Sequence, residues 1–543
     1  MNAPFRSVSL RIASSFLLVL TMLVSCGRRE DPNEGLSIFK YNESAGILTL
    51  DPIYAKDLPH IWACNQLFSS LVAFDEEMQV VPRVAQSWDI SDDGTVYTFH
   101  LRRDVPFHQD EALSEGRCVN AEDVCYSFNR VVDRSLSSPG AWIFASVAHD
   151  DNGYAFRALD DSTFQITLSK PFPPFLGILS MTYASIVPKE AVEYYGDAFR
   201  RHPVGTGPFR FQYWNEGVKL VMRKNPLYFE TDSLGERLPY LDAVSVSFLI
   251  DRQVAFLEFV KGKFDFMSGI DARYKDELLT YDGELRRKYE DKIELITGPY
   301  LNTEYISFYL DPDDRLGVDR SRALRQAVSL SIDRDKMLRY LRNGIGIPGT
   351  GGMIPAGLPG HADSIGYGYD LRQAQRLVNE YRLGNYELNL STTAEYADIG
   401  KFVQSQVEQV GLRCKMEVMP PATLRSMRAN GSLSFFRASW VADYPDAENY
   451  LSLFITDNLS PAGPNYSHYS NPRFDRLYNR AMSMTDEDDR AQLYAEMDAL
   501  MMRDAPVVVL FYDEVLRFVN RRVEGLGSNP TNLLDLRQVR LTH

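Results

Sequence analysis

The sequence predicts an α/β protein in which strands and helices alternate along most of the chain. The clearest unit begins with a strand over 244–250, in which apolar and polar residues alternate. It continues with a helix over 252–260 and ends with a short strand through Phe264 and Phe266. A strand–helix–strand unit of this kind is typical of a parallel sheet. The 543 residues, 45% of them hydrophobic, provide for two to four structural units at about 100–200 residues each.

Three further elements are predicted in the first part of the chain. The segment from Val81 to Trp88 is interpreted as a short helix, and the turn Asp92-Asp93-Gly94 then leads into a strand over 96–101. Asn120 and Asp123 have the spacing of a capping box, in which each side chain accepts a hydrogen bond from the other residue's backbone N–H. This spacing predicts a helix that begins after Asn120 and runs through Val132.

The second half continues the alternation of strands and helices. Leu324, Val328 and Ile332 recur at four-residue spacing on one predicted helix. The apolar run 507–512 predicts a buried strand. Later helices begin at residues whose side chains can cap an N-terminus, namely Asp333, Asp370 and Asn471 with Pro472. The sequence shows no internal repeat and no low-complexity linker, which predicts one assembly built from discontinuous domains.

The N-terminal segment predicts export from the cytoplasm. Arg6 and Arg11 form a basic region before an apolar run over 12–24, which is too short to cross a bilayer that needs about 20 helical residues. The run has the length of a signal-peptide core. It ends in Leu23-Val24-Ser25-Cys26, which resembles a bacterial lipobox and implies cleavage before Cys26 and lipidation of its thiol. The alternative is a plain secretory signal followed by an incidental cysteine.

Charge and cysteine content limit the possible partners. The 58 basic and 73 acidic residues give a net charge of −15, which disfavours nucleic acid and anionic membrane surfaces as partners. Four cysteines follow Cys26, and sequence alone leaves open whether they form disulfides or remain free thiols: Cys64, Cys118, Cys125 and Cys414.

The sequence contains no recognisable catalytic or metal-binding constellation. It has no pair of histidines in the helical spacing of a zinc peptidase, no Gly-x-Ser-x-Gly elbow and no phosphate-binding loop. Gly344, Gly346 and Gly349 match the spacing of a dinucleotide fingerprint, but they follow a predicted helix rather than a strand. We therefore expect no enzyme activity, no cofactor and no metal.

The segment 435–445 is the candidate binding segment. It is an apolar, strand-like run that carries Arg437, Trp440 and Asp443. A buried charge needs a partner, because leaving it unpaired costs several kcal/mol. One hypothesis is that Arg437 and Asp443 pair with other protein side chains or reach solvent. The other is that they face a cleft and hold the carboxylate and the ammonium of a peptide by charge-assisted hydrogen bonds.

Six groups of residues occur in a characteristic order along the chain. They are Leu50-Asp51-Pro52; 82–108 with 121–124; 203–209; 223–228; 324–327 with 332–334; and Asn471-Pro472 with Phe474-Asp475 and Ala505-Pro506. In these groups the chain resembles family 5 extracellular solute-binding proteins, which include the oligopeptide-, dipeptide- and nickel-binding proteins of ABC importers.

The resemblance implies a two-lobed, type II periplasmic-binding-protein-like fold with an additional inserted domain. A hinge is expected near Thr297 and Leu510, where the chain passes between lobes. The implied organisation is a signal peptide (1–25), a lipidated tether (26–35), domain I (36–57, 182–296 and 511–543), domain II (58–181) and domain III (297–510).

The resemblance also implies a binding site. In oligopeptide-binding relatives, the stretch that corresponds to Arg437-Ala438-Ser439-Trp440-Val441-Ala442-Asp443-Tyr444 lines the cleft; its acid binds the peptide ammonium and its arginine can hold a carboxylate. Ser439 departs from the glycine of those relatives. Ala45 and Gly46 are expected to pair with an extended peptide by strand addition.

The function implied is that of a monomeric binding protein, anchored by lipid in the periplasm or at the cell surface. It would deliver an oligopeptide to an ABC permease and its ATPase. Rival hypotheses are the same fold with a metal chelate, haem, opine or oligosaccharide as cargo, or a surface sensor without transport.

Overall fold

The computed structural model describes residues 35–76, 78–269, 271, 274–310 and 316–542. The predicted signal peptide, Cys26 and nearly all of the predicted tether lie outside these residues. No helix among the described residues is long and apolar enough to cross a membrane.

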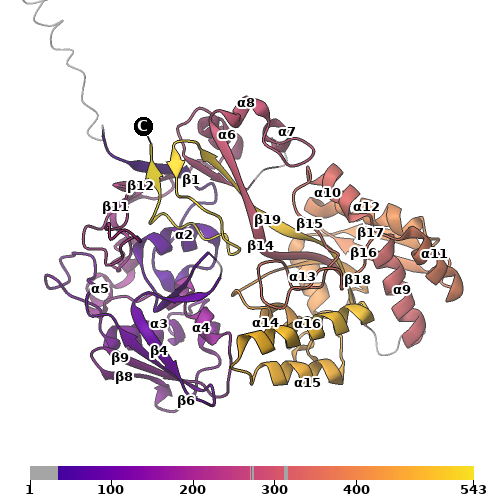
Figure 1. Ribbon diagram of the computed structural model, residues 1–543, viewed down its shortest axis with the longest axis horizontal. Helices are drawn as coiled ribbons and strands as arrows, with labels where there is room; N and C mark the ends of the chain where they lie inside the picture. Colours follow the sequence, from indigo (N-terminus) through magenta and orange to yellow (C-terminus); the bar gives the residue numbers. More distant parts are fainter. Residues whose placement is uncertain (1–34, 77, 270, 272–273, 311–315, 543) are drawn as a thin grey trace, which may run out of the picture. The chain divides into compact units, whose positions relative to one another are not determined.

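The largest feature of the described chain is an 11-stranded sheet. Its two longest strands, β14 (Ile293–Phe308) and β19 (Val507–Asn520), lie side by side near its middle (Figure 1). On the β19 side the order continues through β13 (Phe266–Ser268), β1 (Ile38–Asn42), β12 (Ala243–Ser247), β11 (Lys219–Lys224) and β10 (Phe209–Asn215). On the β14 side it continues through β18 (Phe435–Val441), β16 (Glu387–Thr392) and β17 (Arg413–Val418), and β15 (Ile347–Pro348) pairs with β19.

The β14–β19 ladder has two parts with different neighbours. In the first part, residues 293–299 pair with 514–520, and β13 pairs with this end of β19. In the second part, residues 303–307 pair with 507–512, and β18 pairs with this end of β14. The register shifts between Pro299 and Thr303, where one part gives way to the other. A second shift, between Glu304 and Tyr305, leaves Leu510 outside the ladder.

The predicted parallel unit is confirmed with one addition, but its strands are shorter than predicted: the first ends at Ser247 and the second begins at Phe266. Helix α6 (Arg252–Val260) has the expected bounds, and Asp251 caps it by accepting from the N–H groups of Gln253 and Val254. The flanking strands β12 and β13 both run parallel to β1, which lies between them. The first strand of the chain therefore enters a unit formed about two hundred residues later, which no local pattern could indicate.

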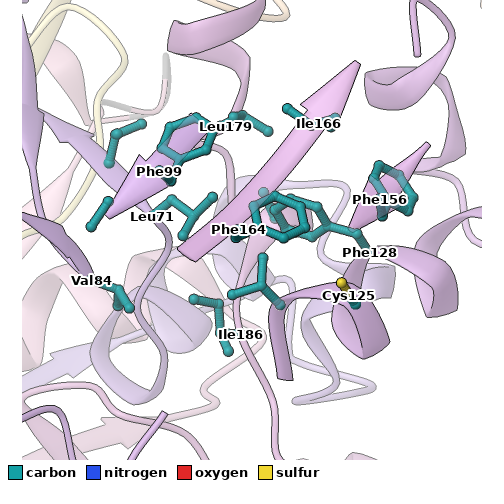
Figure 2. Packing of buried hydrophobic residues seen from close by; sticks show 14 of the residues in the cluster. Leu71, Val84, Phe99, Cys125, Phe128, Phe156, Phe164, Ile166, Leu179 and Ile186 are labelled. Carbon is teal, nitrogen blue, oxygen red and sulfur yellow. The ribbon is translucent and has the colours of Figure 1, made fainter. Parts of the chain in front are cut away.

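A second, antiparallel sheet contains β4 (Ala85–Ile90), β5 (Val96–Leu101), β9 (Thr163–Thr167) and β8 (Phe156–Asp160). Helix α3 (Ala121–Val132) packs on it, and the predicted capping box between Asn120 and Asp123 is present. Figure 2 shows the core beneath, where the ring of Phe128 meets those of Phe156 and Phe164 edge to face, at centroid distances of 5.6 and 5.5 Å.

The predicted helix over Val81–Trp88 is wrong. Its residues belong to two strands, β3 (Val80–Pro82), which pairs with β2 (Val72–Phe74), and β4, in which Trp88 lies opposite Phe99. Pro82 favours an extended conformation in the residue before it and supplies no backbone donor within a helix. Pairing with the strongly alternating β5 then determines the conformation of the rest.

Three of the helices predicted in the second half are confirmed by their caps. The helix predicted through Leu324 and Val328 is present too, but it ends at Ser331, so that Ile332 lies just beyond it in extended conformation. The Asp333 carboxylate accepts from Lys336 N–H at the start of α10 (Arg334–Leu341), and that of Asp370 accepts from Gln373 N–H at the start of α11 (Leu371–Glu380). Asn471 caps α15 (Pro472–Ala481), with Pro472 in its first turn. The other helices of this half are α9 (Val318–Ser331), α12 (Ala397–Glu408), α13 (Pro421–Ala429), α14 (Glu448–Leu451) and α16 (Glu487–Asp504).

The remaining elements are short. They comprise the helices α2 (Leu58–Leu67), α4 (Phe175–Ile178), α5 (Lys189–Tyr195), α7 (Lys275–Leu278) and α8 (Arg287–Glu290), and the strand pairs β6 (His149–Asp150) with β7 (Gly153–Tyr154) and β20 (Val523–Glu524) with β21 (Arg540–Leu541). The disulfide question that the sequence left open has an answer here. All four described cysteines carry free thiols, and three of them are buried.

Candidate functional site

Asp443 lies just beyond the end of a central strand. Strand β18 ends at Val441, so Asp443 lies outside its ladder. The backbone N–H of Asp443 donates to Asn449 Oδ1 at 3.0 Å, and the Trp440 indole N–H donates to the same oxygen at 2.7 Å. Asn449 is buried. One buried amide therefore fixes both the strand end and the segment that carries the acid.

The carboxyl group of Asp443 is accessible to solvent but has protein packed around it. The residue is exposed, yet burial raises the pKa of its carboxyl, and a hydrogen bond with Asn449 opposes this rise. Many protein atoms therefore surround a carboxyl group that solvent still reaches. Within the described part of the chain, no side-chain nitrogen of Lys, Arg or His lies within 4.0 Å of it. Asp443 is thus a partly desolvated acid without a counter-ion.

A second acid, Asp57, affects the same buried tyrosine as Asp443. Burial raises the pKa of the Tyr183 phenol to about 12, and the charges of Asp57 and Asp443 both add to this rise. Asp57 is the N-cap of α2. It also contributes, after burial, to the raised pKa of Glu43, which directly follows β1. Asp57 thus acts on Glu43, and Asp57 and Asp443 both act on Tyr183. We call Glu43, Asp57 and Asp443 the acidic set.

Arg437, in contrast, already has a protein partner. Its Nε and Nη2 donate to Glu304 Oε2 at 3.1 and 2.5 Å, and its guanidinium lies 3.4 Å from the ring centroid of Tyr396. Glu304 is buried, and burial raises the pKa of its carboxyl, while Arg437 opposes that rise. The structure therefore contains the protein pairing that the sequence left open for Arg437. Any ligand contact would depend on its other terminal nitrogen.

Tyr444 is buried beside Asp443 and faces different neighbours. Its ring centroid lies 6.1 Å from that of Trp142 and 6.4 Å from that of Phe172. Its hydroxyl donates to Glu448, as does that of Tyr478. Burial raises the pKa of Glu448 to about 7, and the two phenol hydrogen bonds oppose this rise. The sequence did not single out Glu448 or Asn449 as functional residues. The signal that it offered is that both are polar residues in a largely apolar stretch after the segment 435–445.

Ala45 and Gly46 form a turn rather than a free strand edge. The N–H of Ala45 donates to the Glu43 carboxylate at 3.0 Å, and that of Gly46 donates to the Glu43 carbonyl at 3.3 Å. Gly46 has φ +74°, a left-handed value that glycine adopts readily. Strand addition here would have to use carbonyl groups or follow a rearrangement of the turn.

Across the described residues, no three His, Cys, Asp or Glu side chains are grouped so that they could hold a metal ion. The chemistry that the site offers is electrostatic. Acidic side chains near the buried Tyr183 offer negative charge to a cationic group.

Comparison with known families determines the relationship. The model of bacterial extracellular solute-binding proteins, family 5, matches residues 79–460. The chain belongs to this family. It is accordingly a substrate-binding protein of the ABC transporter type, and the family is one of binding proteins rather than enzymes. Members of the family are periplasmic.

Curated relatives match over most of their length. The dipeptide-binding protein of Escherichia coli K12 is 26% identical over 86% of this chain and 87% of its own. The oligopeptide-binding protein OppA of Salmonella typhimurium is 26% identical over 90% of each. Heme-binding protein A of Haemophilus influenzae is also 26% identical, over 86% of this chain and 85% of its own. Relatives at one level of identity thus bind different solutes.

Solved structures share the fold. HbpA2 from Haemophilus parasuis is 23% identical and superposes with a TM-score of 0.83, covering 93% of this chain and 100% of that one. DppA from Helicobacter pylori, in complex with the peptide STSA, is 26% identical with a TM-score of 0.70, covering 93% and 98%. The predicted type II periplasmic-binding-protein fold, with multiple domains, is confirmed.

Proposed function

We propose that the protein binds an oligopeptide and delivers it to the permease and ATPase of an ABC importer. The observation that carries the proposal is the Asp443 carboxyl, which is partly desolvated, has no counter-ion among the described residues and lies just past the end of β18. A peptide's α-ammonium supplies the missing charge and three N–H donors. A charge-assisted hydrogen bond of this kind contributes about 1.5–3 kcal/mol.

The surroundings of Asp443 favour a cationic end over an anionic one. Asp57 adds its negative charge at Tyr183, where the charge of Asp443 also acts, so that a ligand carboxylate beside Tyr183 would be repelled. Peptide binding therefore has a direction, with the ammonium at Asp443. For the far end of the ligand, a contact between Arg437 and a carboxylate remains our hypothesis, as does backbone pairing at Ala45 and Gly46.

Binding is proposed to close two lobes about a hinge. The register shift between Pro299 and Thr303 supports a hinge there, because backbone without ladder hydrogen bonds bends at lower cost. Closure requires that the ligand favour the closed state by contacts with both lobes. The domain limits proposed are 36–57, 182–296 and 511–543 for domain I, 58–181 for domain II and 297–510 for domain III.

The proposal also includes export and anchoring. Cleavage before Cys26 and acylation of its thiol would hold a monomer at the membrane, since two or more acyl chains anchor a protein stably. Metabolic labelling with an alkyne fatty acid tests this directly. Label should enter the wild type and be absent from Cys26→Ser.

Calorimetric titration with peptides tests the cargo. Asp443→Ala should weaken binding of unmodified tri- to pentapeptides by about 10- to 100-fold. Asp457→Ala, which removes an exposed acid from the same half of the chain, should leave the affinity unchanged. N-acetylated peptides, which lack the ammonium, should bind the wild type and Asp443→Ala equally weakly.

Two outcomes would contradict the peptide assignment. One is an affinity for unmodified peptides that Asp443→Ala does not change. The other is native mass spectrometry of protein purified from its own host that shows a metal chelate, haem, opine or oligosaccharide as the bound cargo.

A further inference from the structure

A pocket with a volume of about 390 Å³ lies on a different set of residues from the acidic set. One side consists of the β2–β3 turn, the start of β5 and residues 171–177; the other consists of 444–447, 483–487 and the first turns of α16. Neither Asp443 nor the other members of the acidic set, Glu43 and Asp57, line it. Its size suits a small organic molecule, because ligand pockets span about 300–1,000 Å³.

The most unusual lining residue is Arg490. The residue is 9% exposed, yet no carboxylate oxygen in the described chain lies within 4.0 Å of its guanidinium. Its one hydrogen bond to described residues is a long one, from Nη1 to the Met484 carbonyl at 3.5 Å. It also lies in the first turn of α16, whose partial positive charge disfavours a cation. A buried guanidinium with free donors is costly unless something binds it.

Acidic and hydroxyl groups lie on the same pocket. Asp446 lines it, and burial raises the pKa of its carboxyl, whereas the Glu448 N–H and the Arg490 charge oppose this. Burial and then the charge of Asp446 raise the pKa of the Tyr494 phenol, and a hydrogen bond to Asp446 that lies outside ordinary geometry adds to the rise. Glu487 and Asp92 add a second and a third acid. The pocket thus carries groups for both a negative and a positive end.

The rest of the lining is mixed: Gln79, Ser91, Asp92, Ser483 and Thr485 add polar groups to an apolar majority. Phe74, Phe172 and Leu176 contribute from one side, and Tyr444, Met484 and Pro359 from the other. A simple anion would gain Arg490 but face Asp446 and Glu487, whereas a zwitterion satisfies both kinds of charge. The geometry points to a second binding site, which takes a small zwitterion with an apolar or aromatic body, such as an apolar α-amino acid or a very short apolar peptide. Its carboxylate would lie on Arg490 and its ammonium near Asp446.

The site would affect solute binding from outside the peptide site. Its two sides come from segments that we assign to domains II and III. A molecule held between them favours the arrangement in which both sides are in contact, and any coupling to peptide affinity is reciprocal. The assignment of the pocket itself does not depend on the cargo bound at Asp443.

Calorimetry with full-length protein and L-phenylalanine tests the site. We expect L-phenylalanine to bind more tightly, by at least tenfold, than 3-phenylpropanoate, which lacks the ammonium, or phenethylamine, which lacks the carboxylate. Arg490→Met keeps an apolar stem and should weaken L-phenylalanine by at least tenfold. Arg480→Met, which removes an exposed arginine from nearby α15, should not.

A second variant guards against a folding defect. Asp446→Asn retains the oxygen that accepts from Glu448 N–H, and it should weaken L-phenylalanine but not 3-phenylpropanoate. Titration with the dipeptide Leu-Leu, beside L-phenylalanine, shows whether the pocket prefers a short peptide or a free amino acid as its zwitterion. Binding of either one that depends on Arg490 supports the site.

Competition separates this proposal from the peptide assignment. L-Phenylalanine should still bind when a tripeptide saturates the Asp443 site. Three results would overturn the second site: no heat with L-phenylalanine at millimolar concentration, an affinity that Arg490→Met leaves unchanged, or full displacement by tripeptide. A protein that binds L-phenylalanine through Arg490 but no peptide would refute the peptide cargo alone.

Discussion

Removing the charge of Arg437 tests whether the fold itself holds this residue. Its ion pair with Glu304 is largely enclosed, with side-chain exposures of 15% for Arg437 and 4% for Glu304. Arg437→Met leaves the carboxylate buried without its counter-ion. Breaking a buried pair on one side costs about 3–5 kcal/mol. Because solvent reaches part of this arginine, we expect the free energy of unfolding to fall by about 3 kcal/mol.

The loss of unfolding free energy in Arg437→Met should depend on pH. Burial raises the pKa of the Glu304 carboxyl and Arg437 opposes the rise, so the pKa increases further in the variant. A carboxyl with a higher pKa in the folded state contributes stability below its unfolded pKa and loses it as pH rises through the folded value. Urea unfolding should therefore show a smaller deficit for Arg437→Met near pH 5 than near pH 7.5.

An exposed ion pair supplies the matched control. Lys415 Nζ lies 2.8 Å from Glu387, with exposures of 69% and 39%, and Lys415→Met should cost less than about 1 kcal/mol. Adding Glu304→Gln to Arg437→Met removes both buried charges and should recover most of the loss. If Arg437→Met costs no more than Lys415→Met, with no dependence on pH, the reasoning is refuted.

Three further predictions concern the regions around the site. Asn120→Ala removes one half of the capping box of α3 and should cost about 1 kcal/mol in urea unfolding; no loss would show that the box is dispensable. Phe128→Ala empties the fully buried centre of the core in Figure 2 and should cost about 3–5 kcal/mol, whereas a loss below 1 kcal/mol would contradict close packing there. Because the pKa of Glu448 is raised to about 7, stability should fall from about pH 4.5 to pH 7 and then level off. Glu448→Gln should flatten that fall, and an identical pH profile would contradict the assignment.

The sequence predicted those elements of the fold whose signals are local. Asn120 and Asp123, or Asp333 and Asp370, act within one turn of the chain, so that spacing alone identifies their helices. Alternation likewise identified the strand over 96–101 because one face of it is buried.

Features that depend on distant partners were not predictable in this way. The segment from Val81 to Trp88 has too short a pattern to separate helix from strand, and its pairing with β5 decides the outcome. The insertion of β1 between β12 and β13, and the pairing of β14 with β19, join segments separated by about two hundred residues. Long-range pairing of this kind leaves no periodic trace in either strand.

The same distinction explains why two charges on one short segment have different surroundings. Arg437 lies within β18, opposite Ile306, so that Glu304 is its diagonal neighbour on the same face of β14. Asp443 lies beyond the last paired residue, Val441, where no neighbouring strand can present a partner. A charge inside a ladder is neutralised by the fold, whereas a charge just past its end stays available to a ligand. Sequence alone names both residues. Only the register of β14 against β18 shows that Arg437 has an ion-pair partner on the neighbouring strand and that Asp443 has none there.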